Sequence, residues 1–166
     1  MKILTERLLI RNLRFEDYPE FERTLNDIQK SAFGGGINFL NWIISQYHAM
    51  DISDGLLSFG IFLKDTENFI GTIGVGDHRD LHEPEIFYHL LPEYRGFGFA
   101  AEAVKKLTEW ALKNYSVKYL IGTVAVDNVR SQRVLELCGY QFIDTRSLKI
   151  HSTNERREFK YYRFYR

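Results

Sequence analysis

The feature that most constrains this chain is a glycine-rich turn, residues 95–98, between a predicted strand and a predicted helix. The strand, residues 85–91, is a short apolar run bounded by prolines, and the helical pattern begins near Phe99. Glycines let a backbone approach an anion closely, and the first N–H groups of a helix lack partners within it. With Arg95 as a nearby cation, the turn predicts a pyrophosphate site rather than a plain tight turn.

The remaining pattern predicts one α/β domain, residues 1–166, built on a mixed sheet. Hydrophobic periodicity predicts helices at residues 18–29, 38–50, 99–114 and 129–138. Apolar or alternating runs predict strands at residues 3–11, 56–63, 69–75, 85–91, 118–126, 140–144 and 157–165. The strand–helix–strand order over residues 85–126 indicates a parallel crossover, whereas residues 56–75 indicate an antiparallel hairpin. We therefore expect a sheet that is antiparallel early and parallel at the glycine turn.

Charge and cysteine content exclude several classes of partner. The chain has 22 Lys plus Arg and 22 Asp plus Glu, and this balance predicts neither nucleic acid nor membrane as partner. The uncharged residues 31–50 include glycines and amides, which are too polar for a membrane span. Charged residues interrupt the N-terminus before a signal peptide could form. The single cysteine, Cys138, excludes an internal disulfide and suits a cytoplasmic location.

The glycine turn also fits a nicotinamide-dinucleotide fingerprint. Gly96, Gly98 and Ala101 match Gly-x-Gly-x-x-Gly/Ala, and Asp127 follows the next predicted strand as a ribose-binding acid would. However, four residues separate the motif from its strand, and the N-terminal half shows no repeated strand–helix–strand units. An NAD(P)-binding enzyme is therefore the weaker interpretation.

Four motifs, taken in order, resemble the GNAT superfamily of N-acetyltransferases. Arg95-x-x-Gly98-x-Ala100 is similar to its acyl-coenzyme A pyrophosphate motif. Three others look like the RimJ/RimL-type branch that acetylates ribosomal-protein N-termini: Thr5-Glu6-Arg7-Leu8, Glu85-Ile86 with Tyr88, and Asn128-x-x-Ser131 with the residues up to Tyr140. The resemblance covers nearly the whole chain. It implies the element order β-α-α-β-β-β-α-β-α-β-β, with a splayed pair of parallel strands.

The resemblance also implies acetyl-CoA as co-substrate and no metal. The splayed strands would be residues 85–91 and 118–126. Backbone groups that would pair with the pantetheine belong to His89, Leu90 and Leu91. Those that would hold the pyrophosphate belong to Arg95, Gly96, Phe97, Gly98, Phe99, Ala100 and Ala101. Asn128 would contact the pantetheine region, or else cap the following helix, with Asp127 as a competing cap.

Acetyl transfer to an amine needs a proton acceptor and benefits from a donor to the leaving thiolate. Glu85 is the candidate base, acting through water; the alternative is an exposed carboxylate at a strand end. Many superfamily members carry a tyrosine donor where this chain has Leu135, so Ser131 is the candidate donor, with helix capping as its alternative. Phe87 stands where the branch commonly has glycine, which bears on the size of the acceptor site.

The sequence thus predicts an acetyl-CoA-dependent N-acetyltransferase whose partner is an amine acceptor, either a peptide N-terminus or a small molecule. A non-catalytic acyl-CoA-binding or regulatory module on the same fold is the alternative, and a homodimer is compatible with both. The residues Asp77, His78, Asp80, His82 and Glu83 match no metal-site spacing, and we interpret them as a solvated loop.

Overall fold

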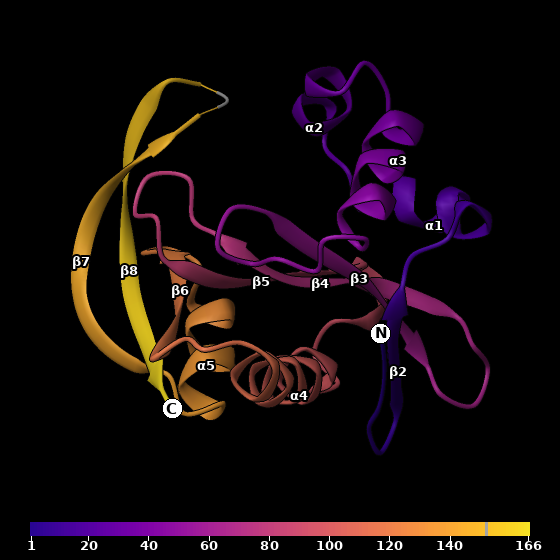
Figure 1. The fold of residues 1–166 in the computed structure, drawn as a ribbon. Helices are drawn as coiled ribbons and strands as arrows, with labels where there is room; N and C mark the ends of the chain where they lie inside the picture. Colours follow the sequence, from indigo (N-terminus) through magenta and orange to yellow (C-terminus); the bar gives the residue numbers. More distant parts are fainter. Residues whose placement is uncertain (152) are drawn as a thin grey trace.

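A computed structural model describes residues 1–151 and 153–166, which form one eight-stranded sheet with five α-helices (Figure 1). The strands are β1 (Lys2–Leu4), β2 (Leu8–Asn12), β3 (Leu56–Leu63), β4 (Phe69–Asp77), β5 (Pro84–Leu90), β6 (Tyr119–Ala125), β7 (Gln141–Ile150) and β8 (Glu155–Tyr165). The α-helices are α1 (Tyr18–Glu22), α2 (Asp27–Ala32), α3 (Gly36–Gln46), α4 (Phe99–Asn114) and α5 (Val129–Leu137). The spatial order is β1-β2-β3-β4-β5-β6-β8-β7, and only β5 and β6 are parallel neighbours within this described sheet. The predicted mixed α/β fold is confirmed.

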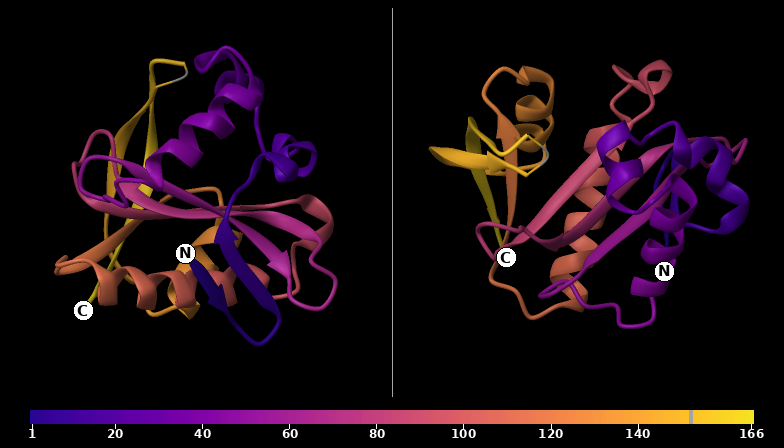
Figure 2. Two further views of the ribbon diagram at one scale, coloured as in Figure 1. Left: turned by 45° about the vertical axis from the view of Figure 1, so that its right-hand side comes forward. Right: turned by 90° about the horizontal axis from the view of Figure 1, so that it is seen from above.

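Helices cover both faces of the sheet (Figures 1 and 2). α4 and α5 lie on one face, where Val104 and Leu107 of α4 are fully buried against Val75 and Ile86 of the sheet. α1, α2 and α3 lie on the opposite face, where Phe21 and other apolar side chains form a second cluster. Because the sheet separates the two layers, a ligand that reaches from one layer to the other must pass between strands.

The sheet is open between its two parallel strands. β5 and β6 pair at one register position, Glu85 with Ile121. β5 stays bonded to β4 along its whole length, and β6 stays bonded to β8. The two strands therefore diverge beyond Glu85, as the predicted splayed pair requires. We call this opening the strand gap.

The N-terminal part differs from the prediction in its details. The single strand expected at residues 3–11 is a hairpin of β1 and β2, because Thr5 accepts the Leu8 N–H at 2.8 Å and turns the chain. The helix expected at residues 18–29 is divided into α1 and α2, because Asn26 has an extended backbone and caps a new helix through the Gln29 N–H. These polar local contacts outweigh the apolar periodicity that suggested continuous elements.

The helix expected at residues 38–50 is present as α3, which begins two residues earlier, at Gly36. It buries Leu40 and Ile43, although it ends at Gln46 rather than Met50. In the described part of the chain, no helix is long and apolar enough to cross a membrane.

The C-terminal part agrees closely with the prediction. α4 has the bounds expected for residues 99–114, and α5 ends one residue early, before Gly139 at φ +89°. β7 is longer than predicted and pairs with β8 as far as Ile150 and Glu155. The resulting hairpin curves away from α4 and α5 toward the side of α1, α2 and α3 (Figure 1).

Candidate active site

A cavity of about 270 Å³ lies in the strand gap. β5, β6, β8 and α5 line it, and its wall includes Glu85, Tyr88, Thr123, Asn128, Ser131 and Leu135. Glu85, Asn128 and Ser131 were singled out from separate motifs of the sequence, and the fold brings all three to one cavity. We call it the gap cavity.

Glu85 is held by the neighbouring strand. Its Oε1 accepts hydrogen bonds from the Thr123 hydroxyl at 2.6 Å and from the Thr123 N–H at 3.1 Å. Burial raises the pKa of Glu85 above its ordinary value, although the charge of His78 and the two Thr123 bonds act in the opposite direction. A carboxylate with a raised pKa accepts a proton more readily than an ordinary glutamate, as a general base requires. Thr123 was not identified from the sequence, because only the register of β5 and β6 pairs it with Glu85.

Asn128 is the cap of α5. Its Oδ1 accepts the Ser131 N–H at 3.2 Å, while Asp127 forms an ion pair with Arg157. The capping interpretation of Asn128 is therefore confirmed, and Asp127 does not compete for that position. The cap uses only the side-chain oxygen, which leaves the Asn128 Nδ2 group to donate to a ligand of the gap cavity.

The position of the expected tyrosine donor is filled by an apolar side chain. Leu135 is 1% exposed and packs on Gly122, where an added Cβ would lie 2.6 Å from Leu135 Cδ1. The Tyr88 hydroxyl donates to the Ser131 carbonyl at 3.4 Å, so two hydroxyl-bearing residues line this wall. Burial raises the pKa of Tyr88 and keeps its hydroxyl protonated. The motif that contains Tyr88 was noticed in the sequence, but its position beside Ser131 was not.

Two positions of the glycine turn have a left-handed backbone conformation that favours glycine. Gly96 has φ +87° and Gly98 has φ +82°, and Gly98 is the N-cap of α4 without a side-chain cap. A Cβ added at Gly96 would meet nothing within 4 Å, so this side of the turn is open. The first N–H groups of α4 therefore combine the positive end of the helix dipole with free access. This arrangement fits a diphosphate.

The backbone N–H and C=O groups of successive β5 residues point alternately toward β4 and toward the strand gap. The Leu91 N–H donates to Ile70 at 2.9 Å and so points toward β4. Because successive residues of a strand direct these groups to opposite sides, His89 also faces β4, whereas Tyr88 and Leu90 face the gap. Leu90 is thus the member of the predicted set that is placed to pair with a ligand, together with Tyr88. Arg95 reinforces this edge, since its Nε donates to the Leu90 carbonyl at 2.9 Å.

The β1–β2 turn is fastened to the glycine turn. Arg7 donates through one guanidinium N–H to the Phe97 carbonyl at 2.9 Å and through Nε to Glu102 at 2.7 Å. The backbone N–H of Arg7 and the Thr5 hydroxyl also donate to Glu102, in the first turn of α4. This contact spans about ninety residues of sequence, and no local pattern predicts it. It fixes the Phe97 carbonyl and therefore the orientation of the adjoining N–H groups.

Replacing Arg7 with methionine is expected to raise the KM for acetyl-CoA several-fold and to lower the free energy of unfolding by about 1 kcal/mol, because the partly exposed contacts of Arg7 are individually weak. Steady-state kinetics and thermal unfolding measure the two effects. Lys106→Met is the control, since Lys106 forms an exposed ion pair with Glu109 on α4. An unchanged KM for acetyl-CoA in Arg7→Met would show that the contact does not orient the turn.

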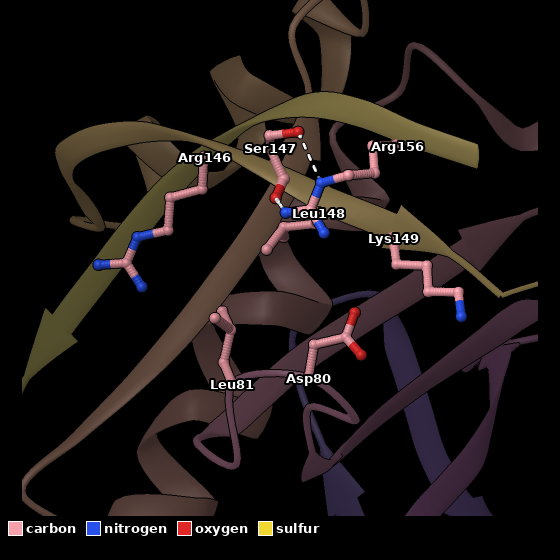
Figure 3. A pocket seen from close by; sticks show the side chains of 7 residues that line it. All are labelled: Asp80, Leu81, Arg146, Ser147, Leu148, Lys149 and Arg156. Atoms are coloured by element: carbon pink, nitrogen blue, oxygen red, sulfur yellow. Dashed lines mark hydrogen bonds between the residues drawn. The ribbon is translucent and has the colours of Figure 1, made fainter. Parts of the chain in front are cut away.

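A second cavity, of about 440 Å³, lies between the β4–β5 loop and β7 (Figure 3). We call it the charged cavity; its lining residues include Asp80, Leu81, Arg146, Leu148, Lys149 and Arg156. Several of these charges are engaged within the chain, because Arg146 pairs with Asp144 at 2.8 Å and Asp80 with His151 at 2.8 Å. We therefore place the candidate active site in the smaller gap cavity, which contains Glu85 and is lined by β5, the strand that precedes the glycine turn.

The side chains that match no metal-site spacing in the sequence contact separate partners. These residues are Asp77, His78, Asp80, His82 and Glu83. His82 pairs with Asp77 at 3.1 Å, and Asp80 turns toward β7. Glu83 accepts hydrogen bonds from the hydroxyls of Tyr119 and Tyr161. These side chains do not converge on one point, in agreement with the interpretation as a loop.

Comparison with known proteins identifies the class to which this fold and site belong. Residues 7–141 match the family model described as "Acetyltransferase (GNAT) domain", and the chain belongs to this family of acetyl-CoA-dependent N-acetyltransferases. The uncharacterized N-acetyltransferase YnaD of Bacillus subtilis (strain 168) is 28% identical over 140 residues, covering 84% of this chain and 82% of YnaD.

Solved structures share the fold. The ribosomal-protein-S5-alanine acetyltransferase from Vibrio fischeri matches with a TM-score of 0.77 at 15% identity, over 99% of this chain and 96% of that chain. The microcin C7 self-immunity acetyltransferase MccE, in complex with acetyl-CoA and AMP, matches with a TM-score of 0.77 at 15% identity, over 98% and 94% of the two chains. At these identities the likeness establishes the fold.

Proposed function

We propose that this acetyltransferase moves the acetyl group directly to a primary amine, which belongs to a peptide N-terminus or to a small molecule. The observation that carries the proposal is the position of Glu85, a half-buried carboxylate in the strand gap, on the strand that leads to the glycine turn. Direct transfer needs the amine and the thioester in one cavity with a base at hand, because the attacking nitrogen must lose its proton.

The chain's own groups suit each part of the reaction. Glu85 takes the proton of the incoming ammonium, through water, and releases the neutral amine for attack. The C–N bond then forms as the C–S bond breaks, and the leaving thiolate takes a proton from Ser131 or Tyr88 on the opposite wall. The nitrogen becomes cationic on attack and releases its second proton, which restores the hydroxyl that protonated the thiolate. Thr123 keeps one oxygen of Glu85 occupied and leaves the second to receive the proton.

The residues that would hold acetyl-CoA define a path along β5, the glycine turn that follows it and the start of α5. The N–H groups of residues 96–101 and the charge of Arg95 would bind the diphosphate. The backbone groups of Tyr88 and Leu90, together with Asn128 Nδ2, would bind the pantetheine. The coenzyme would supply the activated acetyl group at the end of this path.

A non-catalytic acyl-CoA-binding module is a second candidate, and the buried Leu135 in place of a tyrosine donor favours it. Calorimetric titration with acetyl-CoA, CoA and NAD tests the ligand, and thiol release from acetyl-CoA across a panel of amines tests the reaction. We expect CoA binding and amine-dependent thiol release. CoA binding without acceleration by any amine would support the module instead, and binding of NAD alone would refute both candidates.

A further inference from the structure

Two aromatic rings stand with Glu85 on the face of the sheet that α1, α2 and α3 cover. Side chains two residues apart on a strand share a face, so Phe87 lies on the face of Glu85. On β6, Thr123 bonds to Glu85 and therefore shares this face with Ala125, and Phe159 on β8 is the register partner of Ala125. Phe87 and Phe159 both line the gap cavity. Two aromatic rings thus accompany the carboxylate on this face of the cavity.

The ring of Phe87 is fixed in place by the strand beside it. Gly74 is its register partner on β4, and a Cβ added there would lie 2.1 Å from Phe87 Cζ. The ring therefore occupies the space above Gly74. Any residue larger than glycine at position 74 would collide with it. The pair Phe87–Gly74 forms a rigid wall, whereas the resembling branch commonly has no side chain at the position of Phe87.

On this wall, Glu85 is the carboxylate with an oxygen left to interact with an acceptor amine. Glu83, two residues earlier on the same face, accepts hydrogen bonds from Tyr119, Tyr161 and Arg163, which fill its oxygens. A second cation beside the two rings would therefore find no second carboxylate to pair with on this wall, and a charge against apolar rings is poorly solvated.

We infer that Phe87 and Phe159 are specificity-determining residues, which select primary amines whose amine-bearing carbon carries an apolar or aromatic group and no second charge. This inference rests on the proposed function. The cavity of about 270 Å³ admits the amine end and its first substituent, and the rings bury that substituent. The same two rings favour the neutral amine over the ammonium, which assists proton transfer to Glu85.

Competition kinetics with matched acceptors tests the inference. The set contains dipeptide amides X-Gly with X as Phe, Leu, Lys or Asp, together with 2-phenylethylamine and 1,4-diaminobutane. We expect kcat/KM to be about 10- to 200-fold higher for the apolar acceptors, the range that one apolar contact supplies. A preference for the Lys dipeptide or the diamine would overturn the inference. A preference for the Asp dipeptide would do the same, and would point to the charged cavity.

Variants locate the selection. Phe87→Gly and Phe159→Ala should lower kcat/KM for 2-phenylethylamine by about 10-fold or more, and should raise it for 1,4-diaminobutane, whose second charge no longer meets the ring. Phe87→Leu serves if Phe87→Gly unfolds. Phe142→Ala is the control, because Phe142 is 52% exposed on β7 and does not line the cavity. Equal losses for all amines would refute the inference while leaving acetyl transfer intact. If no amine in the set promotes thiol release, the proposed function itself fails.

Discussion

Glu85→Gln is expected to lower kcat by a factor of roughly 10²–10⁴, the usual contribution of a general base. The amide retains the size of the side chain and can still accept the Thr123 hydrogen bonds through its oxygen, but it cannot take a proton from the ammonium. Because Glu85 lies away from the glycine turn, the Kd for acetyl-CoA should be unchanged. The rate of thiol release at saturating substrates measures kcat, and calorimetric titration measures the Kd for acetyl-CoA. Glu109→Gln, on the exposed face of α4, is the control.

The pH dependence of kcat/KM tests directly whether Glu85 is the general base. Burial raises the pKa of Glu85, so the carboxylate protonates at a higher pH than a free glutamate at about 4.3. Activity should therefore fall with decreasing pH already above that value, and Glu85→Gln should lose this acidic limb. Thr123→Val removes a hydroxyl that lowers the pKa of Glu85, so its limb should move to higher pH. A limb that persists in Glu85→Gln would exclude Glu85 as the base.

The part of the fold that surrounds the glycine turn was predictable, because several local signals coincide there. Glycines with positive φ end or begin helices at Gly98 and Gly139, and an amphipathic pattern fills α4 between the turn and Asn114. Ala103, Leu107 and Ala111 recur at helical spacing in the sequence, and α4 buries all three. Local preference and tertiary packing agree in this region.

The N-terminal elements were less predictable, because short polar contacts decide them. A threonine turn makes two strands out of residues 3–11, and the Asn26 cap divides the first helix. Apolar periodicity does not register such contacts, since they replace backbone hydrogen bonds over only a few residues. The strand and helix types were correct, and their number and limits were not.

Single sequence motifs predicted several residues of the candidate site. They did not predict which other side chains these residues contact. Glu85, Asn128 and Ser131 follow from local patterns, and the strand gap brings them together. Thr123 and Phe159 reach the same cavity through strand register, which the sequence alone does not specify. Arg7 reaches the glycine turn from the other end of the chain. Contacts between distant segments therefore account for most of what sequence reasoning missed.

Gly98→Val is expected to raise the KM for acetyl-CoA by roughly 10- to 100-fold, with little change in kcat at saturation. A β-branched residue at φ +82° is strained, and a left-handed backbone costs about 1–2 kcal/mol for an ordinary residue. The turn must rearrange to relieve this strain, which moves the first N–H groups of α4 away from the diphosphate. Each hydrogen bond to a charged group is worth roughly 1.5–3 kcal/mol, and 1.4 kcal/mol is a factor of ten in affinity.

Gly139→Val separates that binding effect from loss of stability. Gly139 has φ +89°, and a Cβ there would meet Phe164 at 3.3 Å, so the same substitution produces comparable strain at the end of α5. Both variants should unfold at lower temperature, but only Gly98→Val should bind acetyl-CoA more weakly in calorimetry. If the two variants lowered acetyl-CoA affinity equally, the glycine turn would not be the diphosphate site. An affinity unchanged in both would lead to the same conclusion, because a turn that tolerates a distorted backbone does not hold the coenzyme through its N–H groups.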